Sequence, residues 1–278
     1  MNARLLFILL LFTIGALWYI IGYWRRKAGE AAFAAARLTE KSEERERYCR
    51  LAVMAGHRKA CRMFCLLHPE RFDGHSPHKP FKLRGIRISF YGYYYPSRYN
   101  ALLNDEQRAF CHSIYQFKQG DIHGIEFFKT CMNALQLKKR PYHIMFMPCS
   151  NWIKYGQRFK RLDWYIGKHR QDLTSGLYDV DIYDARESLH EAKGGEKRIL
   201  ERNYLITGKI KGKEIIIIDD VLTTGQSVVD YKEEIERCGG KVVAAIFYGK
   251  TLSMPSMLLV QIHVWGNHIA HIIERMTK

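Results

Sequence analysis

The sequence has few residues that interrupt regular structure and few acidic side chains. Only 7 prolines and 21 glycines occur among 278 residues, which excludes collagen-like and low-complexity disordered chains. The 7 cysteines are an odd number, and their spacing is neither that of a paired CxxC ribbon nor that of a Cys/His zinc site. We therefore predict free, mostly buried thiols and a reducing compartment. GxSxG, P-loop and HExxH motifs are also absent.

The scarcity of acidic residues leaves a large positive charge. The sequence has 44 Lys and Arg residues but only 28 Asp and Glu residues, so its formal net charge is +16. This excess favours an anionic partner, which leaves open nucleic acid, an acidic membrane face or a phosphorylated small molecule.

A long apolar run occupies residues 5–24, where no charged residue occurs. Twenty helical residues span about 30 Å, the thickness of a bilayer's hydrocarbon core. Arg25, Arg26 and Lys27 follow the run, and only Arg4 precedes it. We predict that residues 1–27 form a single-pass transmembrane anchor that leaves the C-terminal domain in the cytoplasm. A cleaved signal peptide is the alternative, although its basic residues would normally come first.

Residues 28–137 are predicted to be mainly helical, with a break near Ala55-Gly56-His57 and two amphipathic helices within 104–137 that meet near Gly120. The stretch at about 30–66 resembles half of a Sel1-type helical repeat; a helical spacer is the alternative. Alternating aromatic and basic residues at 87–99 fit a stacking platform for nucleic acid, a β-hairpin or a membrane-proximal belt.

We predict that residues 138–278 form an α/β domain with a parallel sheet. Short apolar runs alternate with helical stretches at 155–167, 226–238 and the C-terminal end, the order expected of a sheet covered on both faces. The predicted strands are YHIMFM, DVDIY, YLIT, EIIIID, KVVAAIFY and MLLVQIHVW.

The strongest local signal lies at residues 215–227, where four isoleucines precede Asp219 and Asp220 and a small-residue turn follows. Open α/β sheets bind ligands at the carboxyl ends of their strands. The turn presents N–H groups and hydroxyls at a helix N-terminus, which suits a phosphate, whereas the carboxylates can accept hydrogen bonds from a diol or hold a hydrated Mg²⁺. Phosphate and diol together describe a ribose 5-phosphate.

This thirteen-residue string closely resembles the signature of type I phosphoribosyltransferases, which bind 5-phosphoribosyl-1-diphosphate. The resemblance extends over about residues 142–252. Arg158-Phe159, Arg186 and Glu201-Arg202-Asn203-Tyr204 are similar to the ComF-like branch. The resemblance implies a Rossmann-like parallel-sheet domain preceded by the anchor and the helical region. It also implies a mobile loop over residues 184–200.

The family's roles transfer to matching positions of this sequence. The resemblance implies that Asp219 and Asp220 hold the ribose hydroxyls and act as the catalytic and Mg²⁺-binding carboxylates. Thr223, Thr224, Gly225, Gln226 and Ser227 would bind the 5-phosphate, and Cys149, Ser150 and Asn151 would line the diphosphate. The expected activity is transfer of the phosphoribosyl group to an acceptor, in a chain that could form a homodimer. The alternatives are an inactive sensor or scaffold and a membrane-proximal nucleic-acid-binding protein.

Overall fold

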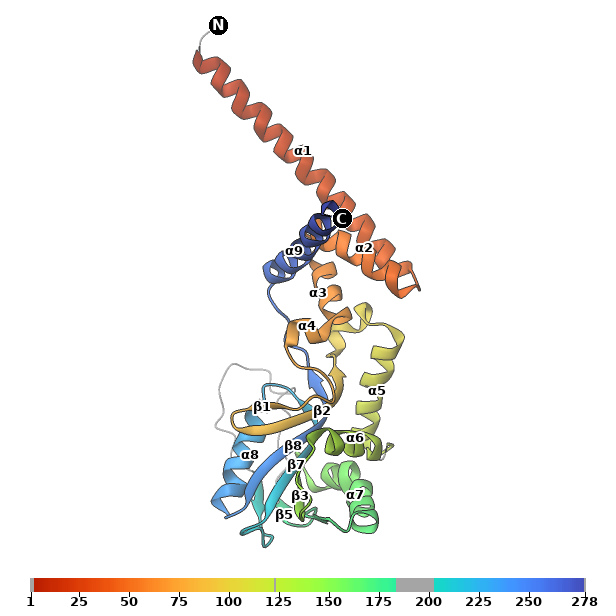
Figure 1. The fold of residues 1–278 in the computed structure, drawn as a ribbon, viewed down its shortest axis with the longest axis vertical. Coiled ribbons are helices and arrows are strands. Elements are labelled where there is room, and N and C mark those ends of the chain that lie inside the picture. Colours follow the sequence, from red (N-terminus) through yellow and green to blue (C-terminus); the bar gives the residue numbers. More distant parts are fainter. Residues whose placement is uncertain (1–2, 123, 184–202, 278) are drawn as a thin grey trace. The chain divides into compact units, whose positions relative to one another are not determined.

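The computed structural model describes residues 3–122, 124–183 and 203–277 (Figure 1). Contacts divide these residues into two compact units. The first holds the described residues up to Gly74, Ala101–Leu103 and those from Ser253 onward, and the second holds His75–Asn100 and Asn104–Leu252.

The first unit is helical. Helix α1 (Ala3–Leu38) packs on α2 (Ser42–Met54), which packs on α3 (Arg58–Leu67), and a short α4 (Pro69–Asp73) follows. The predicted break at Ala55-Gly56-His57 is confirmed, because α2 ends at Met54 and α3 begins at Arg58. The Sel1-type resemblance stays a prediction.

Among residues 3–122, 124–183 and 203–277, no helix has the combined length and apolar character needed to cross a membrane. The residues predicted as a transmembrane anchor, 5–24, lie within α1.

The predicted strand MLLVQIHVW is wrong, because these residues begin helix α9 (Met257–Met276). Ser256 caps the helix by accepting a hydrogen bond from the N–H of Leu259 at 3.4 Å. Val260 and Val264 are the buried residues of α9, and their spacing of four places both on one helical face. A strand would bury every second residue instead.

The second unit is an α/β domain, as predicted. Its six-stranded sheet has the order β1-β2-β8-β7-β3-β4, and every neighbouring pair except β1–β2 is parallel. The predicted strands at YHIMFM, DVDIY, YLIT, EIIIID and KVVAAIFY are confirmed. The strands are β1 (Phe81–Leu83), β2 (Ile86–Tyr94), β3 (Tyr142–Phe146), β4 (Leu173–Ser175), β5 (Val180–Ile182), β6 (Tyr204–Ile206), β7 (Glu214–Leu222) and β8 (Lys241–Thr251).

Helices cover both faces of this sheet (Figure 1). The covering helices are α5 (Asp105–Gln119), α6 (Ile125–Leu135), α7 (Trp152–His169) and α8 (Gln226–Arg237). Buried residues of α5, α6 and α7 form one cluster with Ile216 and Ile218 of β7, and α8 packs on the other face. Because neighbouring strand residues point to opposite faces, the run of four isoleucines in β7 supplies both sides of the core.

The aromatic stretch at 87–99 forms part of this sheet. β1 and β2 make an antiparallel hairpin, and β2 pairs in parallel with β8. Phe90, Tyr93, Tyr95 and Tyr99 are buried, so their rings are not available to stack on bases. The boundary predicted at residue 138 also differs from the division between the units, because the strand and helices before it belong to the α/β domain.

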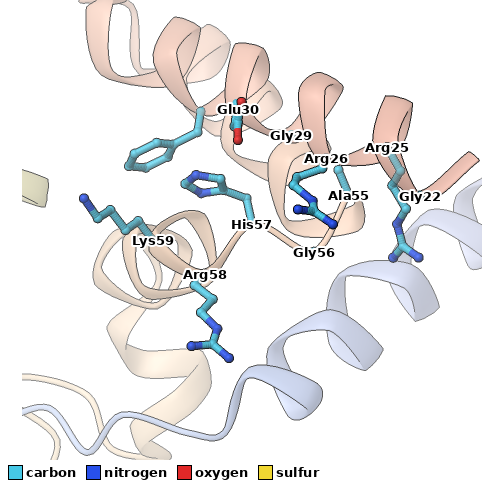
Figure 2. A pocket seen from close by; sticks show the side chains of 11 residues that line it. Gly22, Arg25, Arg26, Gly29, Glu30, Ala55, Gly56, His57, Arg58 and Lys59 are labelled. Carbon is cyan, nitrogen blue, oxygen red and sulfur yellow. The ribbon is translucent and has the colours of Figure 1, made fainter. Parts of the chain in front are cut away.

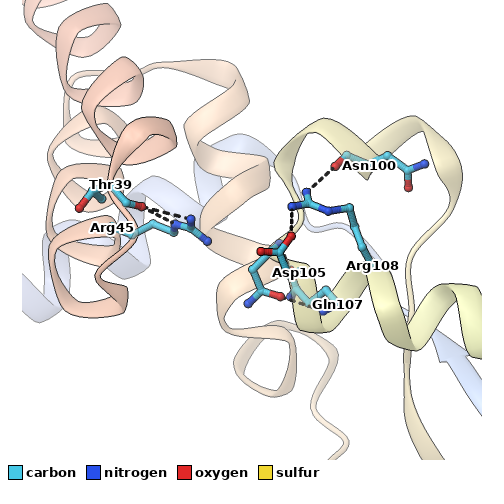
Figure 3. A network of polar contacts seen from close by, with 7 residues as sticks. Thr39, Arg45, Asn100, Asp105, Gln107 and Arg108 are labelled. Atoms are coloured by element: carbon cyan, nitrogen blue, oxygen red, sulfur yellow. Dashed lines mark hydrogen bonds and ion pairs between the residues drawn. The ribbon is translucent and has the colours of Figure 1, made fainter.

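The two helices predicted within 104–137 are confirmed as α5 and α6. Asn104 and Gln107 cap the start of α5 reciprocally, and Arg108 reaches Asp105 and the carbonyl of Asn100 there (Figure 3). Gly120 ends α5 at a φ of +81°, and a Cβ at this position would lie 2.6 Å from the carbonyl oxygen of Gln157. Glycine therefore permits both the turn and the close approach of α7.

A buried histidine ties the two-stranded β5–β6 ladder to the main sheet. His143 of β3 contacts Thr174 at 2.7 Å through Nδ1 and Asp179 at 2.6 Å through Nε2. Burial lowers the pKa of His143, and nearby Lys213 lowers it further. The segment predicted as a mobile loop, 184–200, together with Arg186 and Glu201-Arg202, lies outside the described residues.

Replacing Leu162 with Ala will test the packing of α7 against the sheet. Leu162 is fully buried, so the substitution should lower the free energy of unfolding by about 2–5 kcal/mol. Ile153, on the same helix, is 70% exposed, and Ile153→Ala should change it by less than about 0.5 kcal/mol. Denaturant unfolding measures both variants, and equal losses would contradict the described orientation of α7.

Candidate functional site

The two carboxylates lie inside β7 rather than at its end. β7 pairs with β8 as far as Leu222, two residues beyond Asp220. Asp219 and Asp220 are neighbours near the end of this strand, and both carboxylates lie within 4 Å of the same nitrogen of Arg158. Asp220 is buried, and Asp219 retains partial exposure.

Arg158 of α7 compensates the buried charge of Asp220. One guanidinium nitrogen lies 2.6 Å from Asp220 and 3.7 Å from Asp219. Lys118 of α5 adds a second cation 3.5 Å from Asp220. Two helices of the core thus direct positive charge at the β7 carboxylates. Burial alone lowers the pKa of Arg158, but Asp220, Cys149 and Asp219 raise it above its ordinary value, so the guanidinium stays charged.

Asp219 has a different electrostatic environment. Burial, and then repulsion from Asp220, raise the pKa of Asp219 from 3.8 to about 7, although Arg158 acts in the opposite direction. Its Oδ1 accepts a hydrogen bond from the backbone N–H of Asp220 at 2.7 Å. Near neutral pH, the Asp219 carboxyl therefore gains or loses a proton readily.

The small-residue turn after β7 is exposed and ends at the N-terminus of α8. Thr223, Thr224, Gln226 and Ser227 are exposed, and Gly225 is buried at the N-cap with a φ of +79°. A Cβ on Gly225 would lie 2.3 Å from Cδ2 of Leu83, which would have to shift, and the positive φ would strain any other side chain there. Gly225 has no side chain to cap α8, which leaves first-turn N–H groups for an anion.

Not every hydroxyl and amide of this turn is equally available. The Gln226 side chain donates to Asp230 at 2.6 Å and accepts from Arg84 at 2.6 Å. Thr224 Oγ1 accepts a long hydrogen bond, 3.4 Å, from the N–H of Gln226. The backbone of the turn, more than the Gln226 amide, is free to face a ligand.

The loop after β3 lies close to the carboxylates. Charges on Arg158, Asp219 and Asp220 all act on the buried thiol of Cys149, whose pKa burial raises to about 12. Cys149 is therefore a protonated packing residue and no nucleophile at neutral pH.

Asn203 fixes the backbone of this loop. Its amide nitrogen donates to the carbonyls of Cys149 and Ser150 at 3.1 and 3.3 Å. Asn151 caps α7 by accepting from the N–H of Lys154 at 2.9 Å, so its side-chain oxygen is already used. Ser150 keeps partial exposure beside them.

A cavity of about 340 Å³ adjoins the carboxylates through Lys118, which lines it. It lies between the end of β2, the segment that follows and α5, and sequence reasoning missed it because its residues carry no local motif. Among the described residues, no acidic side chain lines it. The lining residues are Tyr94, Tyr95, Ser97, Asn100, Arg108, Cys111, His112, Ile114, Tyr115 and Lys118.

Part of the chain around this site is similar to a known protein family. Residues 171–251 match the family model of the phosphoribosyl transferase domain, a range that contains Asp219, Asp220 and the turn 223–227. The loop at 149–151 lies before this range.

Curated relatives match this chain only in short stretches. Identity to the orotate phosphoribosyltransferase of Sulfolobus acidocaldarius is 42% over 57 residues, which is 20% of this chain and 26% of that protein. Identity to transcriptional regulator GfcR 1 of Methanosarcina barkeri is 32% over 63 residues, 23% of this chain and 29% of the relative. For GfcR of Methanosarcina mazei it is 29% over 68 residues, 24% of this chain and 32% of the relative. The matched stretches thus span about a quarter to a third of these relatives.

Replacing Arg158 with Met will test whether it compensates the β7 carboxylates. Removing one partner of a buried ion pair leaves an uncompensated charge, so we expect a loss of about 3–5 kcal/mol in the free energy of unfolding. Adding Asp220→Asn to this variant should recover more than half of that loss. Lys160→Met, an exposed substitution on the same helix, serves as the control. No recovery in the double variant would contradict the coupling.

The pKa of Asp219 predicts a pH-dependent effect of Asp219→Asn. In the unfolded chain Asp219 ionises near pH 3.8, whereas in the folded chain it does so near pH 7. The folded state therefore holds an extra proton between these values, and this carboxyl lowers stability as pH rises through that window.

Asp219→Asn removes the ionisable carboxyl and with it this loss of stability as pH rises. The melting temperature of the variant should exceed that of the parent chain by at least about 3 °C at pH 8, and by less at pH 5. Thermal unfolding at the two pH values measures this, and a gain that is larger at pH 5 would contradict the raised pKa.

Proposed function

We propose that this chain, which carries a phosphoribosyltransferase domain of the type I family, binds 5-phosphoribosyl-1-diphosphate and transfers its phosphoribosyl group to an acceptor. The observation that carries the proposal is one strand–turn–helix. The β7 carboxylates and the exposed, uncapped N-terminus of α8 lie within eight residues of each other along the chain. Few ligands other than a sugar phosphate need hydrogen-bond acceptors for a diol next to a phosphate-binding turn.

Each part of the ligand is assigned to the residues whose chemistry matches it. Asp219 and Asp220 accept hydrogen bonds from the ribose hydroxyls, and the backbone of residues 223–227 donates to the 5-phosphate. Ser150 and the backbone of residues 149–151 face the diphosphate. Arg158 offsets part of the negative charge of the carboxylate pair near an anionic ligand.

Mg²⁺ fits this site only as a partner of the ligand. Among the described residues, no group of three or more His, Cys, Asp or Glu side chains could hold a metal ion. Mg²⁺ is commonly held by one or two carboxylates plus substrate phosphates. Asp219 is the better placed carboxylate, because Asp220 is engaged by Arg158. When bound, Mg²⁺ would neutralise charge on the diphosphate.

The proposed reaction is a displacement at the anomeric carbon. A lone pair of the acceptor forms the new bond to that carbon, while the bond to the diphosphate oxygen breaks and its electron pair leaves with the diphosphate. An acceptor N–H gives its proton to solvent. The protein's part is to position the two reactants and to surround the leaving group with donors.

The acceptor's place in this proposal is the cavity beside Lys118. Tyr94 and Tyr115 supply aromatic surfaces, Arg108 and Lys118 supply positive charge, and no acidic residue is found among the described lining residues. Such a lining suits a planar aromatic acceptor that carries negative charge.

A sensor that binds the same ligand without catalysis is the second candidate. Two of the matched relatives are called transcriptional regulators, and this observation favours it. The +16 charge still supports direct nucleic-acid binding, but most of the aromatic residues at 87–99 that would stack on bases are buried.

Membrane attachment through residues 5–24, with the α/β domain on the cytoplasmic side, is also part of the proposal, as is a homodimer. Exposed large apolar side chains on α1 support the attachment: Phe12, Trp18 and Tyr19 are 78%, 75% and 77% exposed.

The deciding experiment is calorimetric titration of the full chain, in neutral detergent, with 5-phosphoribosyl-1-diphosphate and Mg²⁺. Asp219→Asn with Asp220→Asn should weaken binding more than about a hundredfold, because it weakens two charge-assisted contacts. Since that variant also leaves Arg158 uncompensated, Ser227→Asp provides a second test. A carboxylate there favours the N-terminus of α8 but repels a phosphate, so stability should hold while binding falls at least tenfold.

Ser227→Asn is the matched neutral control, and Asp121→Asn is an exposed control for the aspartate pair. If Ser227→Asp binds as the parent chain does, the 5-phosphate assignment is wrong. Diphosphate release on adding planar anionic acceptors would favour the enzyme; saturable binding without release to any of them would favour the sensor.

A further inference from the structure

A second cavity, of about 820 Å³, lies within the helical unit, between α1 and the turn that joins α2 to α3 (Figure 2). It begins at Gly22, two residues before the apolar run of α1 ends. The lining residues are Gly22, Arg25, Arg26, Gly29, Glu30, Phe33, Ala55, Gly56, His57, Arg58 and Lys59. Four of these side chains are basic and one is acidic.

Among the residues that the structure describes, Glu30 is the acidic lining side chain, and it forms no ion pair with the basic lining side chains. Glu30 pairs with Lys27, which is not a lining residue, at 3.5 Å. Among the described residues, none of Arg25, Arg26 and Arg58 forms an ion pair with an acidic side chain. Figure 2 shows Arg25 and Arg26 extending from α1 toward the α2–α3 turn, with Arg58 beyond that turn and Lys59 on the far side of His57.

The walls of the cavity are fixed by packing. His57 caps α3 by accepting from the N–H of Ala60 through Nδ1 at 3.2 Å, and its ring stacks on Phe33 with centroids 4.4 Å apart. This leaves Nε2 as the protonated nitrogen of the neutral ring. Burial lowers the pKa of His57, which keeps the ring neutral at physiological pH. Arg25 donates to the carbonyl of Met54 at 3.0 Å and so holds α1 to the end of α2.

We propose that this cavity binds a phosphate ester, held by Arg26 and Arg58 with Arg25 at its edge and the Nε2–H of His57 as a neutral donor. Guanidinium groups from two facing elements match the several oxygens of one phosphate, as bidentate donors do. Neither the phosphoribosyltransferase domain nor the proposed transfer reaction requires this site.

The exposed apolar surface next to the cavity favours a phospholipid headgroup as the source of the phosphate. Ile20 and Ile21 of α1 are 53% and 56% exposed, and Trp24, just before Arg25, is 66% exposed. Acyl chains along this surface would place their phosphate at the level of Arg25 and Arg26. A soluble phosphate ester satisfies the same arginines, and the experiment separates the two sources.

The test uses the full chain in neutral detergent micelles doped either with phosphatidic acid or with phosphatidylcholine. Native mass spectrometry counts the lipid molecules that stay bound to the protein. We expect phosphatidic acid to be retained in preference to phosphatidylcholine. Glycerol 3-phosphate, added in a separate arm, competes if the headgroup alone is recognised.

Arg26→Gln with Arg58→Gln is the test variant, because it spares the Arg25 bond to Met54 and thereby the helix packing. It should reduce phosphatidic acid retention about fivefold for each arginine. Arg47→Gln on α2, which removes an exposed charge outside the cavity, is the control and should retain the lipid fully.

If glycerol 3-phosphate competes with phosphatidic acid, the site is supported and a soluble phosphate ester is sufficient for binding. If glycerol 3-phosphate does not compete and phosphatidic acid is retained selectively, the lipid is supported as the ligand. Equal retention of the two lipids and no binding of glycerol 3-phosphate would overturn the proposal, as would an equal loss in the Arg47→Gln control. Circular dichroism verifies that each variant is folded.

Discussion

Two adjacent carboxylates in the central region of a buried strand impose the constraint that shapes the rest of the α/β domain. A buried charge is costly unless it is paired, and Arg158 supplies that pairing at 2.6 Å from Asp220. The arginine comes from α7, whose start is fixed by the cap at Asn151 and whose apolar face packs on the sheet. The same packing that closes the core therefore determines the charge at the site.

The surrounding elements continue this arrangement. The loop between β3 and α7 lies near the carboxylates and is held by Asn203, a residue distant in sequence. Lys118 joins the pair to a basic, aromatic cavity formed by α5 and the end of β2. The strand, the turn after it, the loop after β3 and the cavity are thus grouped around one ion pair, which is the arrangement that the proposed reaction between two bound molecules requires.

Local sequence patterns predicted the strands, helices and turns that depend on residues close together in the chain. The isoleucine run predicted β7, glycine at 120 predicted the division between α5 and α6, and the turn after Leu222 predicted the start of α8. Contacts between distant residues were not predictable in this way: Lys118 has no motif that marks it, and the pairing of β2 with β8 joins distant parts of the chain. The wrong strand at the start of α9 shows the limit of short apolar runs, which periodicity alone does not assign to a strand or a helix.

The central claim is that the β7 carboxylates and the α8 N-terminus together form a site for 5-phosphoribosyl-1-diphosphate. Hydrogen–deuterium exchange of the full chain, with and without this ligand and Mg²⁺, tests it most directly, because the proposed donors are backbone N–H groups. The account predicts slower exchange confined to residues 149–152 and 223–229, with the cavity around Arg26 and Arg58 unchanged. Unchanged exchange at both segments, at ligand concentrations that saturate related transferases, would contradict it.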